Sequence, residues 1–164
     1  MNETISWLPP LEELNEFGGN WDRYLDAIYS LFDADYVVTK PKFRGIRLGL
    51  KRYPLEKGKE ATFWHLISSG KDEQNRNIDL RRCERIRWVR AIVDNADDPN
   101  IRIWENRRKN EKRICLWLEC EDYLVILSER KGYIIPWTAY LVTENHRKRL
   151  LQKEYEEFTK TQKC

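Results

Sequence analysis

Hydrophobic positions near the start of the chain follow a helical spacing. Asn20 can cap a helix over residues 21–35, in which large apolar side chains recur every three or four positions: Trp21, Tyr24, Leu25, Ile28, Leu31 and Phe32. Residues 9–17 begin with two prolines and end before a glycine pair, which predicts a shorter helix ahead of the first. Two such helices are too small to form a domain alone. We therefore expect residues 1–39 to be an extension packed on the body of the protein.

The middle of the chain alternates between loops and apolar segments. Residues 40–59 are interrupted repeatedly by glycine and proline, so only a strand or hairpin within residues 43–53 is expected there. The apolar stretch 61–68 is too short to distinguish a strand from a helix, and residues 69–78 form a polar loop. Asp79 is a good N-cap for one helix over residues 80–95, with Pro99 beyond its end.

Strand patterns dominate the second half of the chain. They cover residues 101–104, 113–118, 123–128 and 133–142, with turns at Glu121–Asp122 and Lys131–Gly132. Pro136 indicates that the last strand is interrupted or lies near an edge of the sheet. Thr143 can cap a final helix over residues 144–160. Helices, an antiparallel meander of about four strands and a closing helix predict an α+β fold, whose body is residues 40–164.

Composition excludes several classes of protein. The 164 residues are 41% hydrophobic and 35% charged, which is enough to bury one core and excludes collagen-like, disordered and repeat proteins. No apolar run reaches the roughly 18 residues of a membrane span, and Met1–Thr4 do not resemble a signal peptide. We expect a cytoplasmic protein with no membrane partner. The cysteines form no CxxC pair, so we expect no zinc site and mostly buried, reduced thiols: Cys83, Cys115, Cys120 and Cys164.

The net charge of +3 conceals an uneven distribution. Residues 1–35 contain eight acidic residues and Arg23, a charge of −7, so the remaining residues carry +10. A basic body with an acidic N-terminal segment suggests a polyanionic partner for the body. The alternative is that the charges only keep the surface hydrated.

The helix expected over residues 80–95 places charge on its apolar side. At roughly 100° per residue, Arg81, Arg82 and Arg85 fall in the same arc as Trp88 and Ile92. Buried guanidinium groups need an anionic partner, and the helix N-terminus also favours an anion. The sequence therefore predicts a phosphate site here. Pairing with carboxylates of the acidic N-terminal segment is the structural alternative, and the two can coexist.

Two histidines are available for acid–base chemistry near neutral pH. His65 lies in an apolar stretch that can bury it, as a catalytic group or as an ordinary core residue, and His146 lies in a charged segment expected at the surface. No metal-binding, P-loop or hydrolase motif is present, and no set of converging acids can be assembled. If the protein cuts a phosphodiester, this inventory favours a route without metal or cofactor. In that route the 2′-hydroxyl of RNA attacks its own phosphate.

The segment 133–140 adds further candidates. In a strand Thr138 and Tyr140 point to the same face, where they can hydrogen-bond a phosphate or stack on a base. Ordinary β-propensity explains the same residues. Trp137 is one of seven tryptophans and could be a stacking platform, whereas Trp64, Trp88, Trp104 and Trp117 are expected mainly in the core.

The residues TFWHLIS around His65, RRCERIRW at 81–88, the meander with Thr-Ala-Tyr at 138–140 and the closing helix together resemble a known superfamily. It is the barnase–EndoU–colicin–RelE (BECR) superfamily of small metal-independent ribonucleases, in particular its phage- and prophage-associated branch. The resemblance covers roughly residues 40–158. It implies a toxin-like endoribonuclease that leaves a 2′,3′-cyclic phosphate.

The resemblance also implies roles for individual residues. His65 would be the general acid or base, Arg82 and Arg85 would clamp the phosphate, and Thr138 and Tyr140 would orient substrate or transfer protons. The residues expected to bind RNA beside them are Arg81, Lys51, Arg52, Lys131 and Trp137. An antitoxin or immunity protein is a possible partner. Two alternatives remain, a non-catalytic RNA-binding module and a protein-interaction module of a phage or defence system.

Overall fold

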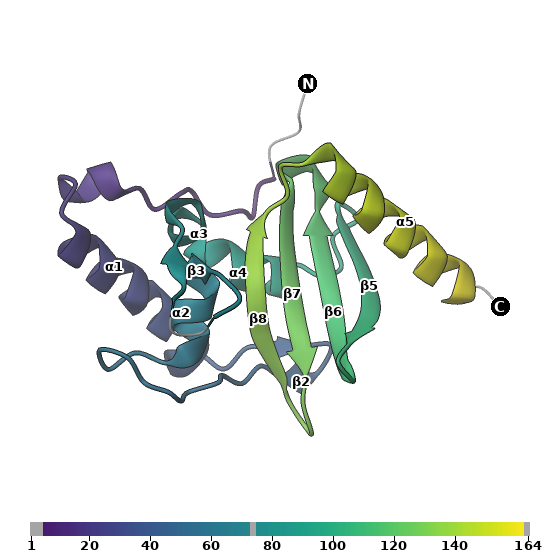
Figure 1. The fold of residues 1–164 in the computed structure, drawn as a ribbon, viewed down its shortest axis with the longest axis horizontal. Helices are drawn as coiled ribbons and strands as arrows, with labels where there is room; N and C mark the ends of the chain where they lie inside the picture. The colour runs from purple at the N-terminus through teal and green to yellow at the C-terminus, as the bar shows by residue number, and fades with distance from the viewer. Residues whose placement is uncertain (1–4, 73–74, 163–164) are drawn as a thin grey trace.

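A four-stranded antiparallel sheet forms the centre of the protein (Figure 1). The computed structural model describes residues 5–72 and 75–162, so Met1–Thr4 and Cys164 lie outside the described residues. The strands follow one another in chain order: β5 (Ile101–Arg108), β6 (Glu111–Leu118), β7 (Tyr123–Glu129) and β8 (Ile134–Leu141). The predicted meander is confirmed. β5 continues beyond Trp104 because the polar residues up to Arg108 still pair with β6.

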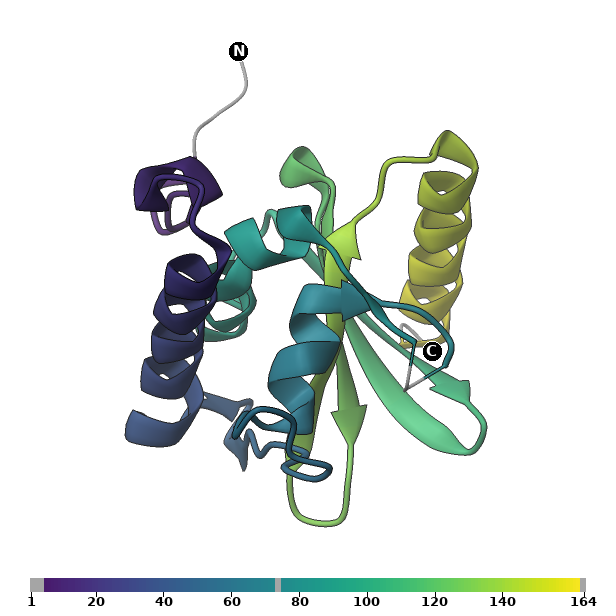
Figure 2. The same ribbon diagram turned by 60° about the vertical axis from the view of Figure 1, so that its left-hand side comes forward.

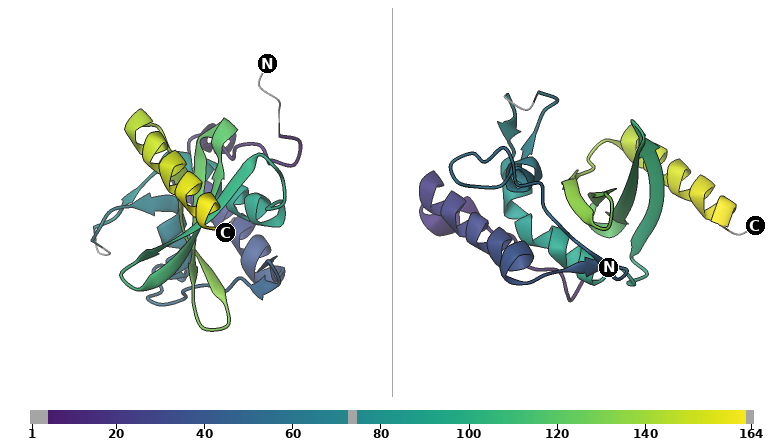
Figure 3. Two further views of the ribbon diagram at one scale, coloured as in Figure 1. Left: turned by 90° about the vertical axis from the view of Figure 1, so that its right-hand side faces the viewer. Right: turned by 90° about the horizontal axis from the view of Figure 1, so that it is seen from below.

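Helices cover both faces of the sheet (Figure 3). On one side lie α1 (Trp21–Asp33), α2 (Ala61–Ile67), α3 (Leu80–Glu84) and α4 (Ile86–Asp94), and on the other lies α5 (Asn145–Gln162). Two small hairpins complete the fold: β1 (Lys42–Phe43) with β2 (Ile46–Arg47), and β3 (Ser68–Ser69) with β4 (Asn77–Ile78). This arrangement confirms the predicted α+β fold, and it shows that the undecided stretch 61–68 is mainly helical.

Alternation along the strands divides the apolar side chains between two cores. Leu116, Val125 and Ala139 face α1–α4, whereas Trp104 and Trp117 face α5 together with Leu151 of that helix. Because both faces are covered, β6 and β7 are buried along most of their length. On this face the helix α5 packs mainly along β5 (Figure 3).

The N-terminal segment is only partly as expected. The Asn20 side chain accepts a hydrogen bond from the Arg23 backbone N–H at 3.1 Å and caps α1, as predicted. The helix expected over residues 9–17 is wrong, since only a 3₁₀ turn at Leu14–Phe17 forms. The preceding backbone packs against α4 instead, where the carbonyl of Pro9 accepts a hydrogen bond from Trp88 Nε1 at 2.8 Å.

The predicted continuous helix over residues 80–95 is also wrong. It breaks at Arg85, whose φ and ψ are −108° and 22°. At this break the Glu84 carbonyl accepts the N–H of Glu12, in the N-terminal segment, at 2.9 Å. The Trp88 N–H bonds to the Arg85 carbonyl at 2.9 Å in a tighter turn. The break divides the predicted helix into α3 and α4.

Three further observations concern the start of α5, the cysteines and the length of the helices. α5 begins at Asn145, and the Glu144 carbonyl accepts the Lys148 N–H at 3.0 Å, so Glu144 occupies the capping position expected for Thr143. Cys83 and Cys115 are buried and Cys120 is exposed, and these three thiols are free. Within the described part of the chain, no helix has the length and apolarity needed to cross a membrane.

The helix α1 shares a hydrophobic core with the sheet, so truncating a buried side chain of α1 should destabilise the whole body. Ile28 is fully buried in the same core as Leu116 of the central sheet, so truncating it leaves a cavity in the body. Ile28→Ala should lower the free energy of unfolding by about 2–5 kcal/mol in a single transition, measured by urea denaturation. The matched control is Asp26→Ala on the exposed side of α1, with a change within about 0.5 kcal/mol. A loss as small in Ile28→Ala as in the control would show that α1 is not part of the core.

Candidate nucleic-acid interface

An open groove runs along the edge strand β8, where α2, the β3–β4 hairpin and α3 lie beside the sheet (Figure 2). Its volume is about 580 Å³. We call it the β8 groove and define it by its lining residues: His65, Ser69, Gly70, Lys71, Arg76, Arg82, Lys109, Arg113, Trp137 and Thr138. Five of these residues are lysine or arginine, and none of the described lining residues is acidic. The groove is therefore a site of concentrated positive charge.

Arg82 joins the helical layer to the sheet at this groove. Its Nη1 donates to the Ser68 carbonyl at 2.7 Å and to Thr138 Oγ1 at 3.1 Å, and its Cζ lies 5.3 Å from the centre of the Tyr140 ring. The side chain is only 12% exposed. Burial lowers the pKa of the Arg82 guanidinium from its ordinary value, and Asp79, 3.8 Å from Nε, opposes this shift. The group stays charged, because arginine is not deprotonated in proteins.

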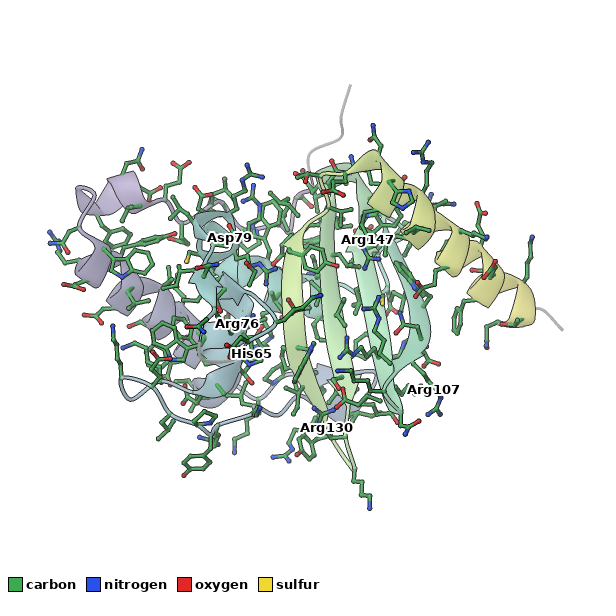
Figure 4. The ribbon with its side chains drawn as sticks, viewed as in Figure 1. His65, Arg76, Asp79, Arg107, Arg130 and Arg147 are labelled. Carbon is green, nitrogen blue, oxygen red and sulfur yellow. The ribbon has the colours of Figure 1, made fainter. Side chains whose placement is uncertain are left out.

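His65 lies in the last turn of α2 and is 7% exposed. Its ring centre is 5.2 Å from that of Trp137, with the planes tilted by 53°. Figure 4 shows His65 and Arg76 together on the helical side of β8. His65 lines the β8 groove on one side and a smaller cavity of about 190 Å³ on the other. The imidazole thus lies at the wall of the groove, beside the indole.

Trp137 occupies an irregular point of β8. The pairing shifts between Ile126 and Leu127, which face Thr138 and Pro136, so Trp137 has no residue opposite it on β7. Proline has no N–H to donate, which suits the edge position expected for Pro136. The guanidinium groups of Arg113 and Arg130 lie 5.6 Å and 5.7 Å from the Trp137 ring. The bulge therefore directs an aromatic surface toward the cations of the groove.

The structure brings together four of the predicted residues. His65, Arg82, Trp137 and Thr138 line the β8 groove, and Tyr140 contacts Arg82 from the next position of the same strand face. The Tyr140 hydroxyl accepts a hydrogen bond from Arg147 Nη2 at 3.3 Å. Tyr140 itself does not line the groove.

Other predicted residues lie elsewhere. Arg85 does not line the groove, because the helix break at this residue places its guanidinium 5.0 Å from the Trp88 ring, with Nη1 donating to the Arg81 carbonyl at 3.0 Å. Arg81 is exposed rather than on the buried arc. Lys51 and Arg52 bond through their backbones to the start of α2, away from the groove. Lys131 is exposed in the β7–β8 turn.

Four cations of the groove were not singled out from the sequence: Lys71, Arg76, Lys109 and Arg113. Arg113 had a detectable signal, since it alternates with Cys115 and Trp117 on one face of a predicted strand. Arg76 had none, because its position depends on a tertiary contact. Its Nη1 donates to the Gly70 carbonyl at 2.8 Å and its Nη2 to the Ser68 carbonyl at 2.7 Å, which holds the β3–β4 hairpin together.

Outside the β8 groove, the cysteine, histidine and acidic side chains offer little further chemistry among the described residues. Burial raises the pKa of the Cys83 thiol and of the Cys115 thiol to about 12, so neither is a nucleophile near neutral pH. Within residues 5–72 and 75–162, no group of three or more His, Cys, Asp or Glu side chains is arranged to hold a metal ion. His146 is exposed, as expected.

Comparison of the chain with protein-family models, with curated proteins and with solved structures finds no match. The residues of the β8 groove are therefore the basis for inferring a function.

The position of Arg82 depends on the cap of its helix. Asp79 Oδ1 accepts the Arg81 N–H at 2.9 Å at the start of α3, as the sequence predicted. Asp79→Ala should lower the free energy of unfolding by about 1 kcal/mol, measured by urea denaturation, because this hydrogen bond is lost. Asp79→Asn should cost only a few tenths, roughly, since asparagine caps equally well. Equal losses in the two variants would show that the charge, and not the cap, is what matters.

Proposed function

We propose that this protein is a metal-independent endoribonuclease that binds RNA in the β8 groove. One observation carries the proposal: an imidazole, three guanidinium groups, two hydroxyls and an indole line a single groove in which no described lining residue is acidic. This combination can hold a phosphate, stack a base and move a proton within one site.

The binding step follows from the charges. The cations of the groove attract the phosphate backbone. Two of them also lie near carboxylates outside the lining, since Asp79 is 3.8 Å from Arg82 and Glu111 is 3.7 Å from Arg113. The Trp137 ring offers a surface on which a base can stack. Arg82 is already oriented by Ser68 and Thr138, so it loses little side-chain freedom when it meets a phosphate.

The cleavage step uses RNA as its own nucleophile. His65 accepts the proton of a 2′-hydroxyl, the 2′ oxygen forms a bond to the adjacent phosphorus, and the bond from phosphorus to the 5′ oxygen breaks. Solvent in the open groove supplies the proton to the departing 5′ oxygen. Arg82 stabilises the charge that builds on the phosphate, and Thr138 fixes Arg82. The products are a 2′,3′-cyclic phosphate and a 5′-hydroxyl.

The BECR resemblance gives this activity a setting. We propose a toxin-like enzyme of a phage, prophage or toxin–antitoxin system, acting in the cytoplasm and held in check by an antitoxin or immunity protein. A second candidate is an RNA-binding module without cleavage. It is favoured by the burial of His65, whose ring lies against Trp137 and which would have to reach the 2′-hydroxyl from the groove wall.

Cleavage is tested with His65→Ala. The purified wild-type protein should cut single-stranded RNA in the presence of EDTA and leave ends with a 2′,3′-cyclic phosphate, followed by gel electrophoresis and mass spectrometry. Removing the acid–base group should slow the reaction by about 10²–10⁴-fold while RNA affinity changes little. His146→Ala is the matched control and should keep full activity, because that histidine is exposed and lies outside the groove.

The same RNA with a 2′-deoxy sugar at the cleaved position should bind and stay intact, because the nucleophile is missing. Cleavage of that analogue would contradict the mechanism. Binding without any cleavage by the wild-type protein would favour the RNA-binding module.

Binding is tested with Arg113→Ala. RNA affinity should fall as salt rises, and each cation lost from the groove should reduce the slope of log K against log salt by about 0.7. Arg113→Ala should therefore lower both affinity and slope, measured by fluorescence anisotropy between low and physiological salt. Arg23→Ala on exposed α1 controls for net charge and should leave the slope unchanged. Equal effects of the two variants would show that RNA does not bind in the groove.

A further inference from the structure

A second aromatic and basic site lies beyond Trp137, at the start of β8. Tyr133 lines a cavity of about 460 Å³ between the β7–β8 turn and the β1–β2 hairpin. The guanidinium of Arg47, on β2, lies 5.5 Å from the Tyr133 ring. Lys42 and Arg130 line the same cavity. An aromatic ring beside a guanidinium repeats the arrangement found at Trp137.

Close packing fixes the position of the Tyr133 ring. A side chain at Gly49 would place its Cβ 2.8 Å from Cδ2 of Tyr133, so only glycine allows the ring to lie against the backbone there. The Gly49 N–H donates to the Ile134 carbonyl at 2.7 Å, which ties this loop to β8. Tyr133 is thus held as a firm surface and is not a loosely attached side chain.

Arg130 connects the two sites. Its guanidinium lies over the Trp137 ring, and the same residue lines the Tyr133 cavity. Figure 4 shows Arg130 at the β7–β8 turn, toward the end of the sheet from His65. The two rings are four residues apart along the chain, which is about 13 Å at strand spacing. The one acidic residue among the described lining of the cavity is Glu129, whose Oε2 lies 3.5 Å from Lys112 Nζ.

We propose that the substrate is an extended single-stranded RNA that leaves the β8 groove past Trp137 and places a further base on Tyr133. This inference builds on the proposed function and specifies its substrate class. Two separated platforms with cations between them suit a strand whose bases are splayed apart. In a duplex the bases are stacked inside the helix and cannot reach such surfaces.

The test measures affinity against length. In a His65→Ala background, which should slow cleavage by about 10²–10⁴-fold, fluorescein-labelled oligouridines of three and twelve nucleotides are titrated by fluorescence anisotropy. The twelve-nucleotide strand should bind about tenfold more tightly or better. Arg47→Ala and Tyr133→Ala should each remove most of that gain and leave the three-nucleotide strand unchanged. Arg47 is exposed, so its variant keeps the fold if Tyr133→Ala does not.

Arg102→Ala is the matched control. Its guanidinium also lies over aromatic rings, 5.4 Å from Tyr155 and 5.8 Å from Trp117, but Arg102 lines neither cavity. It should leave both affinities unchanged.

Three results would overturn the inference while the β8 groove remains an RNA site: equal affinity for the two lengths, no effect of Arg47→Ala on the longer strand, or equally tight binding of a twelve-base-pair duplex. Failure of every oligonucleotide to bind would remove the proposed function as well.

Discussion

The contact of Arg82 with two structural layers determines the candidate site. One guanidinium nitrogen binds the Ser68 carbonyl, where α2 gives way to β3, and the Thr138 hydroxyl on β8. A charged and largely buried side chain thus spans the junction and lines the β8 groove. The cost of burying the charge is offset by the two hydrogen bonds and by the Tyr140 ring.

The position of α5 contributes to the accessibility of this edge. Helix α5 packs mainly along β5 (Figure 3). Arg113 and Trp137 meet near β8, with 5.6 Å between the guanidinium and the ring. The β-bulge at Trp137 then turns an aromatic ring toward that region. Two ordinary features of β structure, an edge strand and a bulge, thus give the groove its shape.

Much of the fold could be predicted from local patterns. The four strands, the Asn20 and Asp79 caps and the turn at Lys131–Gly132 depend on residues close in sequence, and these are present. The break at Arg85 could not be predicted from local sequence, because the Glu84 carbonyl there accepts a hydrogen bond from Glu12, which is distant in the chain. Helical periodicity treats Arg82 and Arg85 alike, but only Arg82 lines the groove.

Part of the candidate site could also be predicted from the sequence. Thr138 and Tyr140 share a face as strand geometry requires, and His65 is buried beside the groove. The cations that complete the groove come from a loop and from the β5–β6 hairpin, at Arg76 and Lys109, and only tertiary structure brings them there. Local sequence shows which side chains can bind phosphate. It does not show which of them meet.

The most direct test of the central claim is to map where RNA touches the protein. Photo-crosslinking of a 4-thiouridine oligonucleotide to the His65→Ala variant, followed by mass spectrometry, reports the contacted peptides. We expect crosslinks to the peptides containing Trp137 and the β3–β4 hairpin. Crosslinks confined to α1 or to the outer surface of α5 would contradict the central claim.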